Sequence, residues 1–382
     1  MSNQPAVVGP DGVARPYIGG QALIEGVMMR SPHAFAAVVR RRSGELVVRQ
    51  EPMPDRRRAL PLVRGVIALV EALRLGSRAL RFSAEVYERD LNEAEAAAKA
   101  SQGDAAPSKP APPTQPGMLS VLSLPVIALA TQEPELPPTT SPGDKGRGLM
   151  TALSVVFALG LFVALPQAFA AGTSALLGLD LDVRSSGFQA LTGAAKIAIV
   201  VGYMLLIRRI PEIYRVFQYH GAEHKSIYTY EAGEALTVEN ARAKSTLHPR
   251  CGTTFLVMVA FVSIFVFTAI GPLLPDFGLG RLLDNVLFFF LKLPFLPVIA
   301  AVTFELQRLL ARFGRGPLRA LLWPGFLVQR ITTIEPEDAQ LEVALGALAV
   351  TLGRERDPSR AIPADPEHYA GYGELLARTV SA

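Results

Sequence analysis

Residues 148–179 read GLMTALSVVFALGLFVALPQAFAAGTSALLGL and contain no charged side chain. A helix rises about 1.5 Å per residue, so a run of this length is long enough to cross the roughly 30 Å hydrocarbon core of a bilayer. Three more apolar runs follow it. The predicted spans are residues 149–172, 187–207, 255–274 and 287–304. The sequence therefore predicts a predominantly α-helical integral membrane protein with about four transmembrane helices.

Two of these spans contain residues that a simple membrane helix avoids. Lys196 lies near the middle of the second span, and Lys292, Pro294 and Pro297 interrupt the fourth. An ionisable side chain inside a span is costly and predicts a functional role by default, although a lysine stem can also carry its charge to the interface. The prolines predict that the fourth span is broken or re-entrant.

Basic side chains are concentrated in alternate loops, which predicts the orientation. The loops after the first and third spans carry one arginine each, Arg184 and Arg281. The other segments are richer in positive charge, and they contain Lys145, Arg147, Arg208, Arg209, Arg215, Lys225, Arg242, Lys244, Arg250, Arg308, Arg312, Arg315, Arg319 and Arg330. The excess of positive charge on the cytoplasmic side predicts that both termini and the loop between the second and third spans face the cytoplasm.

Composition agrees with a membrane protein. Half of the 382 residues are apolar, and the formal charge is +4, which suits a lipid bilayer with an anionic surface as partner. No basic stretch is interleaved with aromatic side chains, so we do not expect nucleic acid as a partner. The single cysteine cannot form an internal disulfide and favours a reducing compartment. Protein partners and homo-oligomer formation stay open.

Outside the membrane region we expect a small N-terminal β-containing cytoplasmic unit. A hairpin turn at Ser43–Gly44 and an amphipathic helix after it define this unit. That helix either lies on the bilayer surface or packs on the β unit. The predicted regions are a disordered N-terminus (1–16), the β-hairpin with the amphipathic helix (17–91), an Ala/Pro-rich linker (92–147), the membrane region (148–311) with a His/Cys loop (208–251), an interfacial segment with a C-terminal amphipathic helix (312–353), and a polar tail (354–382).

The stretch HGAEH at residues 220–224 carries the strongest chemical signal. His220 and His224 are four residues apart, so a helix places both imidazoles on one face, with Glu223 close by. His-x-x-Glu-His is the spacing of the inverted zinc-hydrolase motif. His248 and Cys251 are further donors for the same kind of ion. We therefore predict that His220, His224, His248 and Cys251 bind zinc or another divalent transition metal, and that Glu223 activates water.

The sequence leaves several arrangements of this site open. Four protein ligands would make a closed, structural site, whereas binding by only one of His248 and Cys251 would leave a position for water. Glu231 and Glu234 are candidates for an acidic third ligand. Cys251 could instead be a nucleophile paired with His248. The histidines could also simply bond to other polar groups.

Four stretches together resemble one family. They are GGQALIEGVMMR at residues 19–30, FQYHGAEHK at 217–225, HPRCGT at 248–253, and TTIEPEDAQLEVA at 332–344. The chain resembles the YqhQ-like family of bacterial membrane proteins, described as predicted metal-dependent enzymes of unknown reaction. The similarity covers about residues 17–85 and 145–350. The resemblance implies a bacterial inner-membrane protein, and it supplies no substrate.

The sequence thus leads to one main functional hypothesis and two competitors. We expect a membrane-anchored, cytoplasm-facing zinc hydrolase of unknown substrate. The first competitor is a non-enzymatic membrane scaffold or assembly factor with a structural metal site. The second is a small transporter that uses Lys196 and the broken fourth span.

Overall fold

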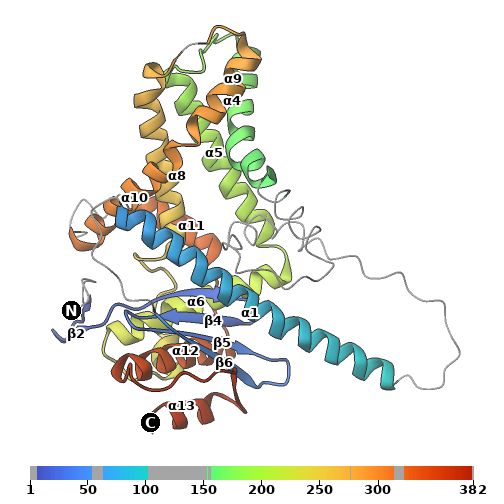
Figure 1. The fold of residues 1–382 in the computed structure, drawn as a ribbon, viewed down its shortest axis with the longest axis vertical. Coiled ribbons are helices and arrows are strands. Elements are labelled where there is room, and N and C mark those ends of the chain that lie inside the picture. Colours follow the sequence, from blue (N-terminus) through green and yellow to red (C-terminus); the bar gives the residue numbers. More distant parts are fainter. Residues whose placement is uncertain are drawn as a thin grey trace, which may run out of the picture.

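A computed structural model describes residues 7–53, 63–101, 153, 156–275, 277–313 and 322–380. These residues are mostly helical, with a small antiparallel sheet near the N-terminus. Figure 1 shows two parts, a tall group of apolar helices and a unit built around the sheet at one end of it. We call the first the helical part; it contains α4 (Leu165–Leu176), α5 (Ser186–Ile207), α8 (Gly252–Ile270), α9 (Arg281–Lys292) and α10 (Phe295–Phe313). We call the second the sheet part; it contains β3–β7 with α1 (Val63–Ser101), α6 (Pro211–Glu231), α12 (Asp338–Arg356) and α13 (Tyr372–Val380).

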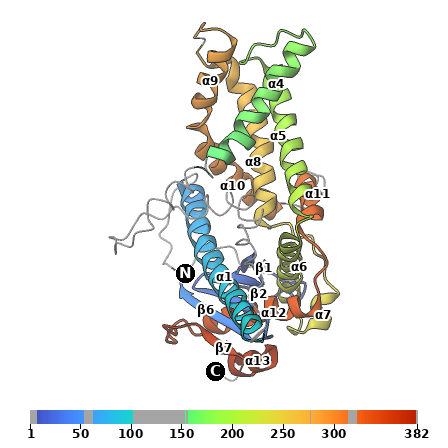
Figure 2. The same cartoon turned by 90° about the vertical axis from the view of Figure 1, so that its right-hand side faces the viewer.

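The sheet is antiparallel, and its strands run in the order β3-β4-β5-β6-β7. The strands are β3 (Gly19–Leu23), β4 (Gly26–Arg30), β5 (Ala34–Arg40), β6 (Leu46–Pro52) and β7 (Glu367–Tyr369). Side chains alternate between the two faces, and both faces are buried. One face packs on α6 and α12, and the other packs on α1 (Figure 2). The sheet is thus the middle layer of three.

Strands β3–β6 of the sheet form two hairpins. The predicted turn at Ser43–Gly44 is confirmed, since it joins β5 to β6 and Gly44 has a φ of 92°. The apolar run before it folds as a second hairpin, β3–β4, whose turn holds Glu25 at a φ of 52°. This left-handed conformation is uncommon for a residue with a Cβ. Arg215 of α6 stabilises it through two hydrogen bonds of 2.5 Å to the Glu25 carboxylate.

The amphipathic helix packs on the sheet. This helix, α1 (Val63–Ser101), buries Leu75, Ala79, Phe82 and Val86 against one sheet face. It also runs past the predicted linker boundary at residue 92, because the stretch after it is rich in alanine and glutamate, which favour helix. The rest of the predicted linker, residues 102–147, lies outside the described residues.

The structure shows ordered elements in both predicted terminal regions. In the N-terminal region, β1 (Val7–Val8) pairs with β2 (Ala14–Arg15); residues 1–6 lie outside the described part. The predicted polar tail contributes β7 to the sheet and α13 (Tyr372–Val380) to the α12 surface. Leu375 is fully buried there. The tail is polar on average, and a few apolar side chains that fit an existing surface are enough to order it.

The helical part contains η1 (Gly160–Ala164), α4 (Leu165–Leu176), α5 (Ser186–Ile207), α8 (Gly252–Ile270), η2 (Gly271–Leu273), α9 (Arg281–Lys292) and α10 (Phe295–Phe313). Among the described residues, Val156–Leu176 and Ser186–Ile207 are long and apolar enough to cross a membrane. The pair α9 and α10 makes a third such segment if it counts as one span. That pair bends by 46° after Lys292, which confirms the predicted break. The apolar stretch Val257–Leu273 is shorter.

The predicted His/Cys loop is largely helical. It contains α6 (Pro211–Glu231) and α7 (Val238–Arg242). Two helices later in the chain complete the surroundings of this loop, α11 (Trp323–Thr332) and α12 (Asp338–Arg356). Of the predicted interfacial segment, residues 314–321 lie outside the described part.

Candidate metal centre

Helix α6 lies between the sheet and the segment that joins α11 to α12. Pro211 occupies its first turn, where a missing N–H costs nothing. At Gly221 the helix touches that segment so closely that a Cβ would overlap the carbonyl oxygen of Ile334. The Ile334 N–H donates to the Phe217 carbonyl at 3.0 Å. The HGAEH motif lies in the middle of α6, which is consequently buried on every side.

Two histidines of this motif converge on the single cysteine. One ligand atom each from His220, His224 and Cys251 lies within 4.8 Å of the others. The His220 Nε2 is 3.1 Å from the Cys251 Sγ, and the two imidazole centroids are 4.5 Å apart. All three side chains are buried. Cys251 reaches them from the residue before α8, so the cluster joins α6 to the helical part.

The outer nitrogens of both imidazoles are fixed by main-chain carbonyls. The His220 Nδ1 lies 2.8 Å from the Thr332 carbonyl oxygen, and the His224 Nδ1 bonds to the Thr246 carbonyl oxygen. A carbonyl only accepts, so each Nδ1 carries the proton and each Nε2 keeps a lone pair. This pattern is the usual support for a metal-binding histidine.

The inner atoms of the cluster fit a transition-metal cation. The His224 Nε2 is buried, and the imidazole interacts with the neighbouring Cys251 thiol. Burial lowers the pKa of His224, and the neighbouring His220 lowers it further. Neutral imidazole nitrogens and a sulfur are donors that zinc prefers.

His248, the fourth predicted ligand, lies beside this cluster and is not among the three converging residues. Its main chain exchanges two hydrogen bonds of 2.8 Å with the amide of Gln329. Its ring centroid is 4.6 Å from that of Tyr228 and 5.6 Å from that of His224. Burial lowers the pKa of His248 to about 4, so the ring is neutral at physiological pH.

Glu223 faces the sheet. Its carboxylate accepts a hydrogen bond from the Gly20 N–H, and a Cβ on Gly20 would lie 2.8 Å from the Glu223 Oε1. Burial raises the pKa of Glu223 to about 8; the charge of His220 opposes this effect, and that of Cys251 adds to it. The carboxyl group is therefore mostly protonated at neutral pH, and its pKa depends on the neighbouring His220 and Cys251.

The two other acidic candidates have different partners. Glu231 pairs with Arg250 and lies 3.6 Å from the His248 Nε2, whereas Glu234 pairs with Lys244. The supporting groups that the sequence did not reveal are the Thr246 and Thr332 carbonyls, the Gln329 amide and the Gly20 N–H. Main-chain groups have no residue-type signal, and Gln329 is distant in sequence.

Two comparisons with known proteins match most of this chain. A family model described as "Protein of unknown function (DUF1385)" matches residues 60–354. The uncharacterized protein YqhQ of Bacillus subtilis (strain 168) is 31% identical over 337 residues, which cover 86% of this chain and 90% of that protein. No solved structure matches the chain. The chain therefore belongs to the YqhQ-like family, DUF1385.

Proposed function

We propose that this protein is a membrane-anchored, metal-dependent hydrolase whose site faces the cytoplasm and holds zinc or a similar divalent cation. The observation that carries the proposal is the convergence of His220, His224 and Cys251 within 4.8 Å. Hydrogen bonds to main-chain carbonyls orient both imidazoles in advance. Preorganised donors of this kind are typical of metal sites.

Three protein donors favour a reaction over a purely structural role. With three ligands, a tetrahedral zinc site keeps one position for water, and zinc makes such a water acidic near neutral pH. Glu223 is the proton acceptor in this proposal, because its carboxyl group interacts electrostatically with His220 and Cys251. A carboxyl group whose pKa lies near 8 both takes and returns a proton at neutral pH. The Gly20 N–H orients that carboxyl group.

The membrane arrangement in this proposal is supported by the way in which distant segments of the chain pack together in the sheet part. Residues 19–52, 211–242 and 338–380 pack into one unit, so they lie on one side of a bilayer. Any crossings between two of these segments must then be even in number. The helices α4 and α5 supply two, and α8 with the bent pair α9–α10 supplies two more. This parity favours four spans over three.

The cytoplasmic side follows from charge. Arg208 and Arg209 directly follow α5, and Arg330 lies near the end of α11. The Arg208 guanidinium donates to the Arg330 carbonyl at 3.2 Å, so these basic residues gather where the helical part meets the sheet part. Basic residues favour the cytoplasmic end of a span.

Elemental analysis of the detergent-purified full chain tests the metal site. We expect about one equivalent of zinc in the wild type and none in His220→Ala/His224→Ala. Glu223→Gln should keep the metal while hydrolysis of p-nitrophenyl acetate, used as a general reporter, falls by about 10²–10⁴-fold. Loss of metal in Glu223→Gln would overturn the role given to Glu223, and a metal-free wild type purified without chelator would overturn the site.

A structural metal site is the second candidate. It is favoured by the burial of all three donors and by the fact that they join α6 to the beginning of α8. In that case, His220→Ala/His224→Ala should lower the unfolding temperature sharply, and chelation should do the same. If the fold survives metal loss and only the reporter reaction disappears, the catalytic proposal holds.

A further inference from the structure

A hollow lies at the junction between α5 and α6. Helix α5 ends at Ile207, and Pro211 begins α6. A proline disfavours helical backbone at the residue before it, and Ile210 is accordingly extended, with a ψ of 123°. The turn between the two helices leaves a hollow of about 680 Å³ that is open to the surface. Its lining residues are Leu205, Arg208, Arg209, Pro211 and Tyr214.

Two guanidinium groups line this hollow without a carboxylate partner. The Arg208 guanidinium donates to the Arg330 carbonyl at 3.2 Å, and among the described residues neither Arg208 nor Arg209 forms an ion pair. The acidic residue nearest to them in the sequence, Glu212, does not line the hollow. A guanidinium group has five N–H donors, so most donors of both arginines remain available for an anion.

Apolar side chains lie next to these charges, on the α5 side of the hollow. Leu205 lines the hollow and is 47% exposed, and Leu206 beside it is 56% exposed. Helix α5 is one of the helices that are long and apolar enough to cross a membrane. Its apolar surface therefore continues up to the two guanidinium groups.

Aromatic side chains surround the same level of the molecule. Helix α11 lies beside this end of α5 (Figure 2), and its Trp323 is 58% exposed. Tyr214 of α6 lines the hollow and is also exposed. Exposed Trp and Tyr rings favour the headgroup level of a bilayer, because each ring has an apolar body and a polar group. In the membrane arrangement proposed above, the hollow thus lies where the hydrocarbon core meets the headgroups.

We propose that this hollow binds an anionic phospholipid, with its phosphate on Arg208 and Arg209 and an acyl chain along Leu205. Guanidinium groups bind phosphate oxygens through paired hydrogen bonds, and basic pockets on the cytoplasmic side of membrane helices bind anionic headgroups. A zwitterionic phospholipid adds an ammonium group that the two arginines repel. A soluble phosphate ester has no acyl chain to cover the exposed leucine. The inference rests on the proposed membrane arrangement and does not involve the metal.

Native mass spectrometry of the detergent-purified full chain tests this proposal. Phosphatidylglycerol or phosphatidylcholine with the same acyl chains is titrated, and the dissociation constant of the first bound lipid is measured. We expect the wild type to bind phosphatidylglycerol about 10-fold more tightly, since one hydrogen bond to a charged group accounts for such a factor. Arg208→Gln/Arg209→Gln should lose this preference. Arg209→Gln alone retains the Arg208–Arg330 contact and should lose part of it, so the test does not depend on the double variant folding.

Two further variants separate this site from overall charge and from the metal centre. Arg242→Gln/Lys244→Gln removes the same charge from two residues that already pair with carboxylates in the sheet part, and it should keep the preference. His220→Ala/His224→Ala should keep it as well, so failure of the hydrolase proposal would not affect this result.

The lipid comparison also distinguishes the headgroup site from membrane crossing. Equal binding of the two lipids by the wild type would overturn the headgroup site and leave the crossing intact. A preference that survives Arg208→Gln/Arg209→Gln, or that disappears equally in Arg242→Gln/Lys244→Gln, would overturn it too. Glycerol 1-phosphate has the phosphate without acyl chains, and binding as tight as that of phosphatidylglycerol would overturn the assignment to a lipid.

Discussion

Gly221 sets how closely α6 approaches the α11–α12 segment, and through it where His220 meets the Thr332 carbonyl. We predict that Gly221→Ala destabilises the protein by about 1–3 kcal/mol, because the new Cβ would overlap the Ile334 carbonyl oxygen and neither main chain can move freely. Gly346→Ala in α12 is the matched control. Its Cβ would meet Leu375 at 3.5 Å, an ordinary contact, and alanine favours helix by up to about 1 kcal/mol.

Thermal unfolding of the two variants checks this prediction. Gly221→Ala should unfold at a lower temperature than the wild type and hold less metal, while Gly346→Ala should not fall below the wild type. Equal stability of both variants would show that the close approach at residue 221 is not a constraint.

Glu223 gives the metal-free protein a characteristic pH dependence. Burial raises the pKa of its carboxyl group from the ordinary 4.5 to about 8, so the folded chain keeps a proton that the unfolded chain releases in this range. Stability should therefore fall as the pH rises from about 4.5 to 8 and level off above that. Denaturant titrations of metal-free wild type and Glu223→Gln check this. The variant should lose this component, and an unchanged pH profile would contradict the burial of an ionisable carboxyl group.

At the scale of residues, the sequence identified the candidate metal-binding side chains but not how they are arranged. The four-residue spacing of His220 and His224 follows from helix geometry, and the structure places both imidazoles on one face, beside Cys251. The displacement of His248 was not predictable, because it depends on a tertiary contact with Gln329. Likewise, only the approach of β3 to α6 determines that Glu223 faces Gly20.

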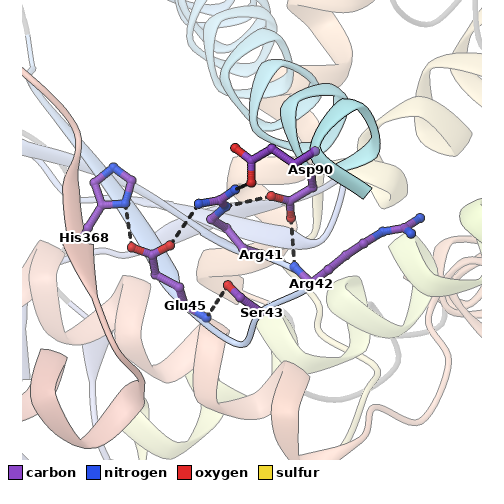
Figure 3. A network of polar contacts seen from close by, with 7 residues as sticks. Arg41, Arg42, Ser43, Glu45, Asp90 and His368 are labelled. Atoms are coloured by element: carbon purple, nitrogen blue, oxygen red, sulfur yellow. Dashed lines mark hydrogen bonds and ion pairs between the residues drawn. The ribbon is translucent and has the colours of Figure 1, made fainter. Parts of the chain in front are cut away.

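At the scale of elements, one polar network joins the β5–β6 turn to its neighbours. Figure 3 shows Arg41 between the carboxylates of Asp90 and Glu45, with His368 of β7 on the far side of Glu45. The Arg41 Nε donates to Asp90 at 2.6 Å, and the Arg42 N–H donates to the other Asp90 oxygen at 2.8 Å. The network therefore attaches both α1 and the C-terminal strand to the same hairpin.

Removing the central cation of this network should loosen α1. We predict that Arg41→Met destabilises the protein by about 1–3 kcal/mol, because it leaves the buried Asp90 carboxylate without its cation. Arg242→Met removes one side of an exposed pair with Asp338 and should cost less stability than Arg41→Met. Urea unfolding compares the two variants. Hydrogen exchange in α1 should increase in Arg41→Met only, and similar losses in both variants would contradict a specific role for Asp90.

The sequence predicted those elements that have distinctive turn residues or a regular hydrophobic periodicity. The β5–β6 hairpin and α1 have clear turn and amphipathic signals, and both are present. Strand β7 has three residues, of which Tyr369 alone is buried, so no pattern distinguishes it from loop. Its pairing with β6 arises from a surface that the rest of the chain has already formed.

For the whole molecule, the testable feature is the side of the bilayer on which each part lies. Cys251 is the only cysteine, so Cys251→Ser gives a background for labelling. We predict that a membrane-impermeant maleimide labels Leu177→Cys, in the α4–α5 connection, only from the outer side, and Ser43→Cys, in the sheet part, only from the inner side. Sealed vesicles of known orientation provide the measurement. Labelling of both positions from one side would contradict a crossing by α4 and α5.

The overall architecture was only partly predictable from sequence. Apolar runs identify helices that could cross a membrane, because length and the absence of charge are the criteria for such helices. The three-layer sheet part was not predictable, since its strands, α6, α12 and α13 come from segments far apart in the chain and meet only through tertiary packing.

The position of β7 has a consequence for biosynthesis. The ribosome releases residues 367–369 long after residues 19–52, yet they complete the edge of a sheet that begins at Gly19. The nascent hairpins must wait, with β6 unpaired at that edge, while the intervening helices are synthesised. A chain truncated before Glu367 would leave this edge exposed for good, and an exposed strand edge favours aggregation.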